Sequence, residues 1–382
     1  MKMTLKEIDA AVASYVAAAK QAGAWSASTN NLAGLLDKIA KTITIDGLFE
    51  DKLPELDGEE LPLGKTIEEY YQDLCAITDW EAISSNDSDP AGAALKPYYP
   101  EYEDASYNYT LGKRIIPTTI KYDEYERAFN SEAEYVVCVN MILKRLYDTF
   151  AMFKYDAKKQ VLANLIAKVV ACQADSGATS LVPGTTDIVK GTRYVFTDSD
   201  SAKHYAIAKK AHTHDAADTF ASLVAAGILV EYRMINELAK PVDTATGEAF
   251  VEQVKKDVEE AQYATEGFSL NGNSVGAAEG LLLVVLKGIK PVLDVQVEAG
   301  AFNPEKLALP AEIKVVDKFG NDANDVYAIL IDRRIARLHP SYMSVKEQLN
   351  GAGDFVNYFL HTENTAFIGK NCFVKVYKNV SE

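Results

Sequence analysis

The sequence has few cysteines, and none of them forms a redox or metal-binding motif. Its four cysteines are far apart and include no C-x-x-C pair: Cys75, Cys138, Cys172 and Cys372. Small secreted domains that depend on disulfides are, in contrast, dense in cysteine. We therefore expect reduced, mostly buried thiols and an intracellular origin.

Long hydrophobic runs are missing as well. The longest apolar run, GLLLVVL at 280–286, is much shorter than the roughly 18 residues that indicate a membrane-spanning helix. The opening stretch MKMTLKEIDAAVASYV carries charges where a signal peptide has its apolar core. We expect no contact with a membrane, and we interpret 280–286 as a buried strand or short helix.

Positive charge is scarce. The chain has 39 Lys and Arg against 55 Asp and Glu, a formal net charge of −16, and no Lys/Arg-rich run. Proteins that bind nucleic-acid phosphates usually present a basic face. The composition therefore argues against nucleic acid as the primary ligand and leaves weak, non-specific contact. Hydrophobic residues make up 48% of the chain, enough for a sizeable core.

The common catalytic signatures G-x-S-x-G, H-E-x-x-H and G-x-G-x-x-G do not occur. Gly64-Lys65-Thr66 is similar to the end of a phosphate-binding loop, but that motif needs a glycine five positions before Gly64. The nearest earlier glycine is Gly58, one residue too distant. Because no apolar strand precedes it either, the sequence argues against a nucleotide site here.

The segment HTHDAAD contains the densest group of possible metal ligands. His212 and His214 lie near Asp215 and Asp218, and imidazole with carboxylate is a usable ligand set. No third cluster of ligands is visible elsewhere in the sequence. A polar helix start capped by Asp215 is therefore the favoured interpretation, and a metal site at His212 and His214 is the alternative. His339 and His361 are isolated and are expected to be structural or on the surface.

Residues 131–172 form the most strongly patterned stretch of the chain. They include no Gly or Pro, and their apolar residues recur every three or four positions, from Tyr135 to Val169. Ser131 followed by Glu134 is typical of a capping box. The pattern predicts one helix about 60 Å long, with a bend or break at Tyr155-Asp156, where the apolar stripe weakens.

The other segments predict a mixture of strands and helices. Residues 60–122 read as a two-stranded ribbon that leaves the body and returns, and such a ribbon is marginal alone in water. Residues 201–240 and 247–262 are expected to be helical, and 270–330 to be βαβ-like. The last fifty residues carry strand patterns, with one long strand closing the chain. A helix at 4–22 and an extended arm at 23–57 precede the ribbon.

Several segments resemble the major capsid proteins of tailed bacteriophages, which have the Hong Kong 97-type fold. LPLGKTIEEYYQDL at 61–74 is similar to the segment that enters the E-loop in capsid proteins of small podophages. TLGKRIIPTTIKYDEYERAFNSEAEY at 110–135 resembles the return into their spine helix. LDVQVEAGAFN at 293–303 and VYAILIDRRIARLH at 326–339 resemble their axial-domain strands. Residues 240–275 have no clear counterpart.

The resemblance implies an α+β fold of four parts. These are an N-terminal arm at 1–57, an E-loop at 58–122, a peripheral domain with the spine helix at 123–195 and 331–382, and an axial domain at 196–330. It also implies a head protein that assembles through pentamers and hexamers into an icosahedral shell around double-stranded phage DNA. Such a protein belongs to the virion and assembles in the host cytoplasm.

The implied partners are other copies of the chain, portal and scaffolding proteins, and decoration or head-fibre proteins. No enzyme activity, catalytic residue, cofactor or metal is implied. The residues expected at contacts between subunits are Lys65, Glu68, Glu69, Lys113, Arg114, Arg333, Arg334 and Arg337. The three arginines beside the strand VYAILID fit a salt-bridging subunit edge and an ordinary solvated basic patch equally well.

Two other functions are weighed against this interpretation. The first is an encapsulin-type shell of the same fold, which encloses an enzyme in a cell instead of DNA. The second is a metal-dependent enzyme that uses His212 and His214. A neighbouring cargo gene would favour the first, and metal bound to the purified protein would favour the second.

Overall fold

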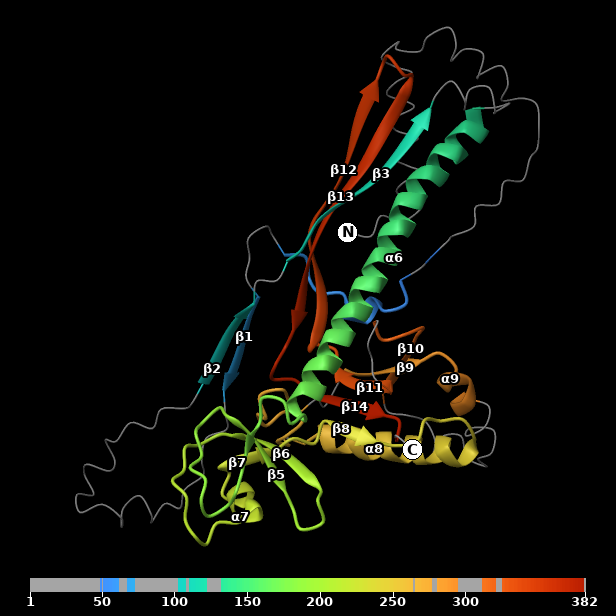
Figure 1. Ribbon diagram of the computed structural model, residues 1–382. Coiled ribbons are helices and arrows are strands. Elements are labelled where there is room, and N and C mark those ends of the chain that lie inside the picture. Colours follow the sequence, from blue (N-terminus) through green and yellow to red (C-terminus); the bar gives the residue numbers. More distant parts are fainter. Residues whose placement is uncertain are drawn as a thin grey trace, which may run out of the picture.

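A computed structural model describes residues 49, 51–61, 67–72, 102–107, 110–121, 132–263, 265–276, 280–294, 311–320 and 325–380. A long arm, built from one helix and one sheet, rises from a broader body that contains two further sheets (Figure 1). The predicted helix at 4–22 and nearly all of the predicted N-terminal arm lie outside the described residues.

The helix α6 (Glu132–Cys172) runs through both the arm and the body (Figure 1). Its 41 residues correspond to about 60 Å at 1.5 Å per residue, so the predicted helix is confirmed. The predicted break at Tyr155-Asp156 is wrong, because the helix is continuous there. Tyr155 is buried at 7% exposure and donates a hydrogen bond from its hydroxyl to Asp317. These tertiary contacts stabilise the helix where its apolar stripe is weak.

The sheet of the arm has the strand order β12–β13–β3. β12 (Ala336–Asn350) and β13 (Phe355–Ile368) form a long antiparallel hairpin, and β3 (Thr110–Lys121) pairs with β13. All three strands contact α6. One face of the sheet buries Ile120, Val356 and Leu360, and Val356 pairs with Ile120 across the two strands. β3 therefore forms part of the arm sheet.

The body is built around a five-stranded sheet with the order β10–β9–β11–β14–β8. Its strands are β8 (Ile235–Glu237), β9 (Leu281–Leu286), β10 (Glu312–Val316), β11 (Val326–Asp332) and β14 (Val374–Lys378). β9 and β10 are parallel and flank α9 (Ile289–Val292), so the predicted βαβ-like pattern is confirmed. Residues 295–310, which include most of another predicted strand, lie outside the described residues.

Two helices cover the two faces of this sheet. Leu282 and Val284 of β9 pack with Leu162 and Leu165 of α6 in one core. The intervening strand residues Leu281, Leu283 and Val285 pack on α8 (Thr244–Ala261), with Phe250, Val251 and Val254, in the other. Strand alternation thus places consecutive residues in opposite cores. The polar helix predicted at 247–262 is confirmed as α8.

A smaller four-stranded unit extends from the body. It contains β4 (Thr179–Ser180), β5 (Arg193–Thr197), β6 (Lys203–Ala208), β7 (Leu229–Glu231) and the short helix α7 (Phe220–Ala225). Its own core includes Leu181, Ile188, Tyr194 and Leu223. The predicted strand RYVFTD is therefore confirmed as β5.

The helix predicted across 201–240 is wrong apart from α7. Its alanines favour a helix in isolation, but Ala206 and Ala208 are buried where β6 pairs with β7. Tertiary pairing thus overrides local propensity.

Two segments connect the arm and the body. Residues 51–61, which include the 3-10 turn η1 (Pro54–Leu56), lie against α6 and β12. β1 (Ile67–Gln72) and β2 (Tyr102–Tyr107) pair as an antiparallel ribbon. The predicted ribbon over 60–122 is only partly right, because its expected returning strand is β3, which pairs with β13 in the arm sheet. The single closing strand predicted from the sequence is in fact two strands: β13 ends at Ile368, and β14 starts at Val374 in the body sheet.

Candidate contact surfaces

The structure places the predicted contact residues on three separate surfaces and not in one site. Glu68 and Glu69 lie on β1, Lys113 and Arg114 lie on β3, and the three arginines lie at the junction of β11 and β12. Lys65 lies outside the described residues. Each surface therefore has to be considered by itself.

On β1, alternate residues face in opposite directions. Glu69 accepts hydrogen bonds from the backbone N–H groups of Lys370 and Asn371 at 2.9–3.1 Å, and Tyr71 donates to the Ser274 carbonyl at 3.2 Å. This side holds the ribbon against its own body. The other side presents Glu68 and Tyr70, and Tyr70 is 71% exposed. Only Glu68 of the two glutamates is thus displayed outward.

At the junction of β11 and β12, each of the three arginines has its own partner, and that of Arg334 is a buried carboxylate. Asp332 is 1% exposed and accepts hydrogen bonds from Arg334 Nε at 3.1 Å. This bond raises the pKa of Arg334. Arg333 pairs with Glu312, and Arg337 donates to the Arg333 carbonyl at 3.2 Å. The side chain of Arg334 is still 63% exposed, so a firmly held guanidinium faces solvent.

On the arm sheet, Lys113 and Arg114 line a pocket of about 240 Å³. β13 is the central strand and places Glu363 opposite Lys113 and Thr362 opposite Arg114. The other lining residues are Tyr342, Lys346 and His361. Sequence reasoning missed all of these except the two β3 cations, because only long-range strand pairing brings residues near 113 and 361 together.

A buried lysine attaches segment 51–61 to α6, and sequence reasoning did not identify it. Lys158 is 1% exposed and reaches Asp51 at 2.5 Å, Asp57 at 2.8 Å and the Leu53 carbonyl at 2.7 Å. Burial alone raises the pKa of Asp57, but hydrogen bonds from Lys158 and Lys154 outweigh it, so this pKa is lowered. The sequence offered one signal for this attachment: the acidic residues Asp51 and Asp57 flank the Leu53-Pro54 pair.

The segment also binds the hairpin. The Gly58 N–H donates to the Leu338 carbonyl at 2.9 Å, and the Leu61 N–H donates to the Pro340 carbonyl at 2.9 Å. A Cβ at Gly58 would lie 2.3 Å from the His339 ring, which explains a glycine at this position. Segment 51–61 thus ties the spine helix to the arm sheet.

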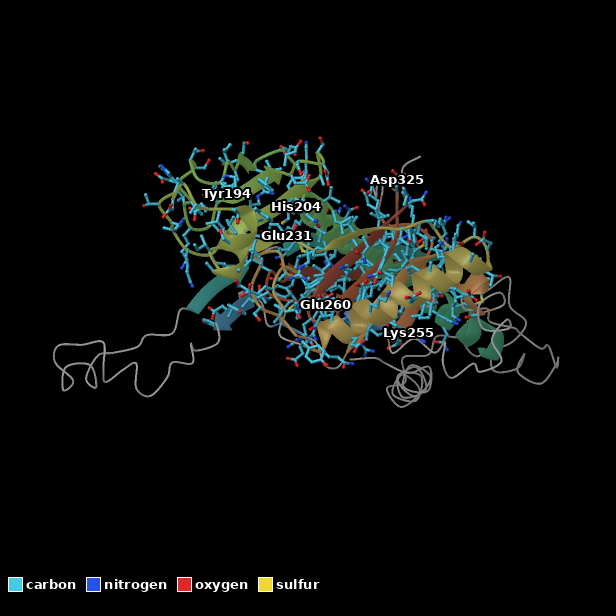
Figure 2. All side chains as sticks on the ribbon, turned by 90° about the horizontal axis from the view of Figure 1, so that it is seen from below. Tyr194, His204, Glu231, Lys255, Glu260 and Asp325 are labelled. Carbon is cyan, nitrogen blue, oxygen red and sulfur yellow. The ribbon has the colours of Figure 1, made fainter. Side chains whose placement is uncertain are left out.

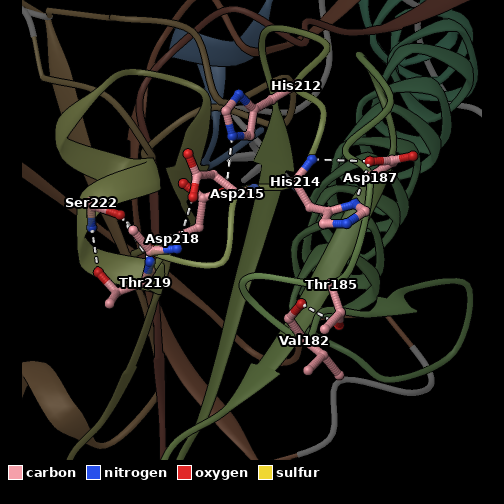
Figure 3. Close-up of polar contacts among 10 residues, drawn as sticks. Val182, Thr185, Asp187, His212, His214, Asp215, Asp218, Thr219 and Ser222 are labelled. Atoms are coloured by element: carbon pink, nitrogen blue, oxygen red, sulfur yellow. Dashed lines mark hydrogen bonds and ion pairs between the residues drawn. The ribbon is translucent and has the colours of Figure 1, made fainter.

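The two histidines of HTHDAAD are directed at different carboxylates (Figure 3). His212 Nε2 lies 2.9 Å from Asp218, whereas His214 Nδ1 lies 2.8 Å from Asp187. Among the residues that the structure describes, no group of three His, Cys, Asp or Glu is placed to hold a metal ion. The predicted helix start at Asp215 is wrong, because α7 begins at Phe220 with Thr219 as its cap.

His204 forms a third pair of this kind in the four-stranded unit, where His204 and Glu231 lie close together (Figure 2). Its Nδ1 is 2.6 Å from Glu231, and its Nε2 is 3.4 Å from Asp198. The bond to Glu231 is the main cause of its raised pKa; burial opposes the rise, and Asp198 adds to it.

Within the described part of the chain, none of the helices is long and apolar enough to cross a membrane. No curated protein sequence matches the chain. Among solved structures, the capsid structure of Staphylococcus phage Andhra superposes with a TM-score of 0.56 at 10% identity. That match covers 91% of this chain and 88% of the other.

A structure of the head fiber and inner core protein gp22 of native bacteriophage P68 includes a chain that matches with a TM-score of 0.51 at 11% identity. The match covers 90% of this chain and 88% of that one. At such low identity these matches show the fold alone, which is the expected Hong Kong 97-type α+β fold.

The family of Phi29-like phage major capsid proteins matches residues 3–370, which is nearly the whole chain. This match agrees with the separate features described above: a long spine helix, a ribbon, an arm sheet and a layered body. The chain therefore belongs to the Phi29-like phage major capsid protein family, and it is a major capsid protein of an icosahedral phage shell.

Proposed function

We propose that the chain assembles through pentamers and hexamers into a closed shell that surrounds double-stranded phage DNA. Family membership supports the shell, and one structural observation supports the mode of assembly. The β1–β2 ribbon has only two strands, and its outward side chain Tyr70 is 71% exposed. A two-stranded ribbon is marginal in water; its inner side is held by the body of the same chain, and a neighbouring subunit can cover its exposed outer side.

We propose an assignment of the elements to domains that follows the predicted domains with two changes. Residues 1–57 act as the N-terminal arm, and the ribbon around β1 and β2 acts as the E-loop. The peripheral domain contains α6 with β3, β12 and β13, whereas the axial domain contains the body sheet. β3 pairs with β13, and β14 pairs with β11, so we assign β3 to the peripheral domain and β14 to the axial domain.

The contact residues fit this scheme in different ways. We propose that Glu68, Lys113, Arg114 and Arg334 meet neighbouring subunits, because their side chains are exposed. Arg333, Arg337 and Glu69 act as internal supports of those surfaces, because each is bonded within its own chain. Lys65 stays in the proposal as a contact of the E-loop.

Further partners follow from the function of a phage head. We propose that the shell incorporates a portal, assembles on a scaffolding protein in the host cytoplasm, and carries decoration or head-fibre proteins. Contact with DNA is weak and non-specific, because the net charge of −16 disfavours tight capture of phosphates. We propose no catalytic role, cofactor or metal.

Light scattering and negative-stain images of the purified chain test the proposal. We expect particles of megadalton mass with round outlines, made of the chain alone or together with a scaffolding protein from the same genome. Pentamers and hexamers should be visible as capsomers in averaged images. A chain that stays monomeric with both the portal and the scaffolding protein present would contradict the proposal.

A further inference from the structure

Unpaired positive charge gathers in the pocket on the arm sheet. Lys113 and Arg114 from β3 and Lys346 from β12 line it, and all three are exposed. Within the described part of the chain, none of the three forms an ion pair. Some cations elsewhere are neutralised, for example Lys158 by aspartates of segment 51–61 and Lys314 by two glutamates. The pocket instead gathers three cations without an ion pair in a chain with net charge −16.

The chemistry of the pocket suits an anion. Its lining has three cations against one carboxylate, Glu363. Thr362 lines it too, at 2% exposure, but strand alternation directs its buried hydroxyl to the opposite face of the sheet from Lys113 and Lys346. Glu363 opposes such an anion, and the three cations outweigh it.

The size of the pocket limits what can enter. Its volume of about 240 Å³ is below the roughly 300–1,000 Å³ typical of sites for small organic ligands. A single carboxylate side chain fits this space, as does an inorganic anion. The pocket also lies beside the outer half of β12, which is mostly exposed, so a protein surface can approach it.

We propose that the pocket receives an Asp or Glu side chain from a second copy of this chain. The inference rests on the proposed function, because only an assembling chain meets its own copies at high local concentration. Charge complementarity selects the occupant: the chain has 55 acidic residues against 39 basic ones, so its copies repel one another overall. A local positive site that accepts a carboxylate sets their register and offsets that repulsion.

Charge reversal tests the proposal. Lys346→Glu, alone and with Arg114→Glu, should lower shell yield at least tenfold while the circular dichroism and melting temperature of the free chain are unchanged, because exposed unpaired side chains contribute little to stability. Lys287→Glu makes the same charge change at an exposed lysine of the body and should assemble as wild type does. Normal shells from the double variant would overturn the inference.

Acetylation of lysines, followed by mass spectrometry, gives a second measurement. Lys113 and Lys346 should react in the free chain and be protected in shells. Equal reactivity in both states would overturn the inference. Protection of the free chain by millimolar inorganic phosphate alone, as strong as that caused by assembly, would show a small-anion pocket and also overturn it. If wild-type chain forms no shells even with its scaffolding protein, the proposed function fails and the inference fails with it.

Discussion

The two halves of α6 have very different surroundings. In the body, Leu162, Leu165 and Val169 are fully buried, and even Lys158 is 1% exposed. In the arm, Met141 and Met152 are 42% and 54% exposed, although Leu146 on the same half is buried. The exposed side of the helix carries polar residues such as Gln160 and Lys168 in the body, whereas it carries methionines in the arm. Apolar surface left open in this way is typical of an interface.

The sheets repeat this difference. Every residue of β11 in the body is buried, whereas most of the outer half of β12 is exposed. The four-stranded unit resembles the body in this respect, because it has a core of its own. We infer that the body and the small unit are stabilised within one subunit, and that neighbours cover the exposed sides of the arm sheet and the ribbon.

The largest effect should come from the ribbon connection. Replacing residues 75–100 by a short Gly-Ser linker should abolish shells completely while the body stays folded, because the buried residues that the structure describes in the two body cores come from other segments. Sedimentation velocity measures assembly, and circular dichroism measures folding. Shells of normal yield would contradict the assignment of this segment as the E-loop.

A large loss of stability is expected at Lys158. Lys158→Met leaves the carboxylates of Asp51 and Asp57 partly buried without their main cation, and breaking a buried ion pair costs about 3–5 kcal/mol. Denaturant unfolding of the free chain measures this. Lys154→Met is the matched control: its side chain is 18% exposed, so its cost should be clearly smaller. Equal costs would show that Lys158 is not the central anchor.

Two leucine substitutions, one in the body and one in the arm, distinguish an effect on stability from an effect on assembly. Leu165→Ala should lower the free energy of unfolding by about 2–5 kcal/mol, because it opens a cavity in the core. Leu349→Ala removes a side chain that is 72% exposed and should change that free energy by less than about 0.5 kcal/mol. Leu349→Ala should nevertheless reduce shell yield. A variant that assembled normally would remove the β12 edge from the interface.

The smallest effect should come from pH. The folded-state pKa of His204 is raised, chiefly by Glu231, so protonation favours the folded state. Its contribution is fully present below the ordinary pKa of about 6.5 and is lost as pH rises through the raised value. The site is a third exposed, which limits the contribution to below about 1 kcal/mol.

Unfolding of wild type and His204→Gln between pH 6 and pH 9 measures this contribution. The difference in unfolding free energy between the two proteins should shrink as pH rises. A difference that grew over the same range would mean that folding stabilises the neutral form of His204 and lowers its pKa.

Local signals predicted the regular elements of the body well. The apolar stripe with no Gly or Pro identified α6, and the apolar runs at 312–316 and 326–332 identified β10 and β11, whereas the run at 280–286 predicted either a strand or a short helix and contains β9. The failures have a common cause. Residues 201–240 read as helix because alanine has high helix propensity, yet strand pairing and burial decided otherwise. The double role of the closing segment was missed because its turn at 369–373 interrupts a strongly strand-like pattern.

By itself, the sequence determined the spine helix and the mixture of helices and strands, because each element depends on the spacing of apolar residues within one segment. Only the tertiary structure decided that Lys113, Lys346 and Thr362 share one pocket and that Lys158 holds Asp51 and Asp57. These groups are separated by about a hundred residues or more along the chain, or by the turn of a hairpin. Pairing of strands and the burial of charge bring them together, and neither leaves a local pattern in the sequence.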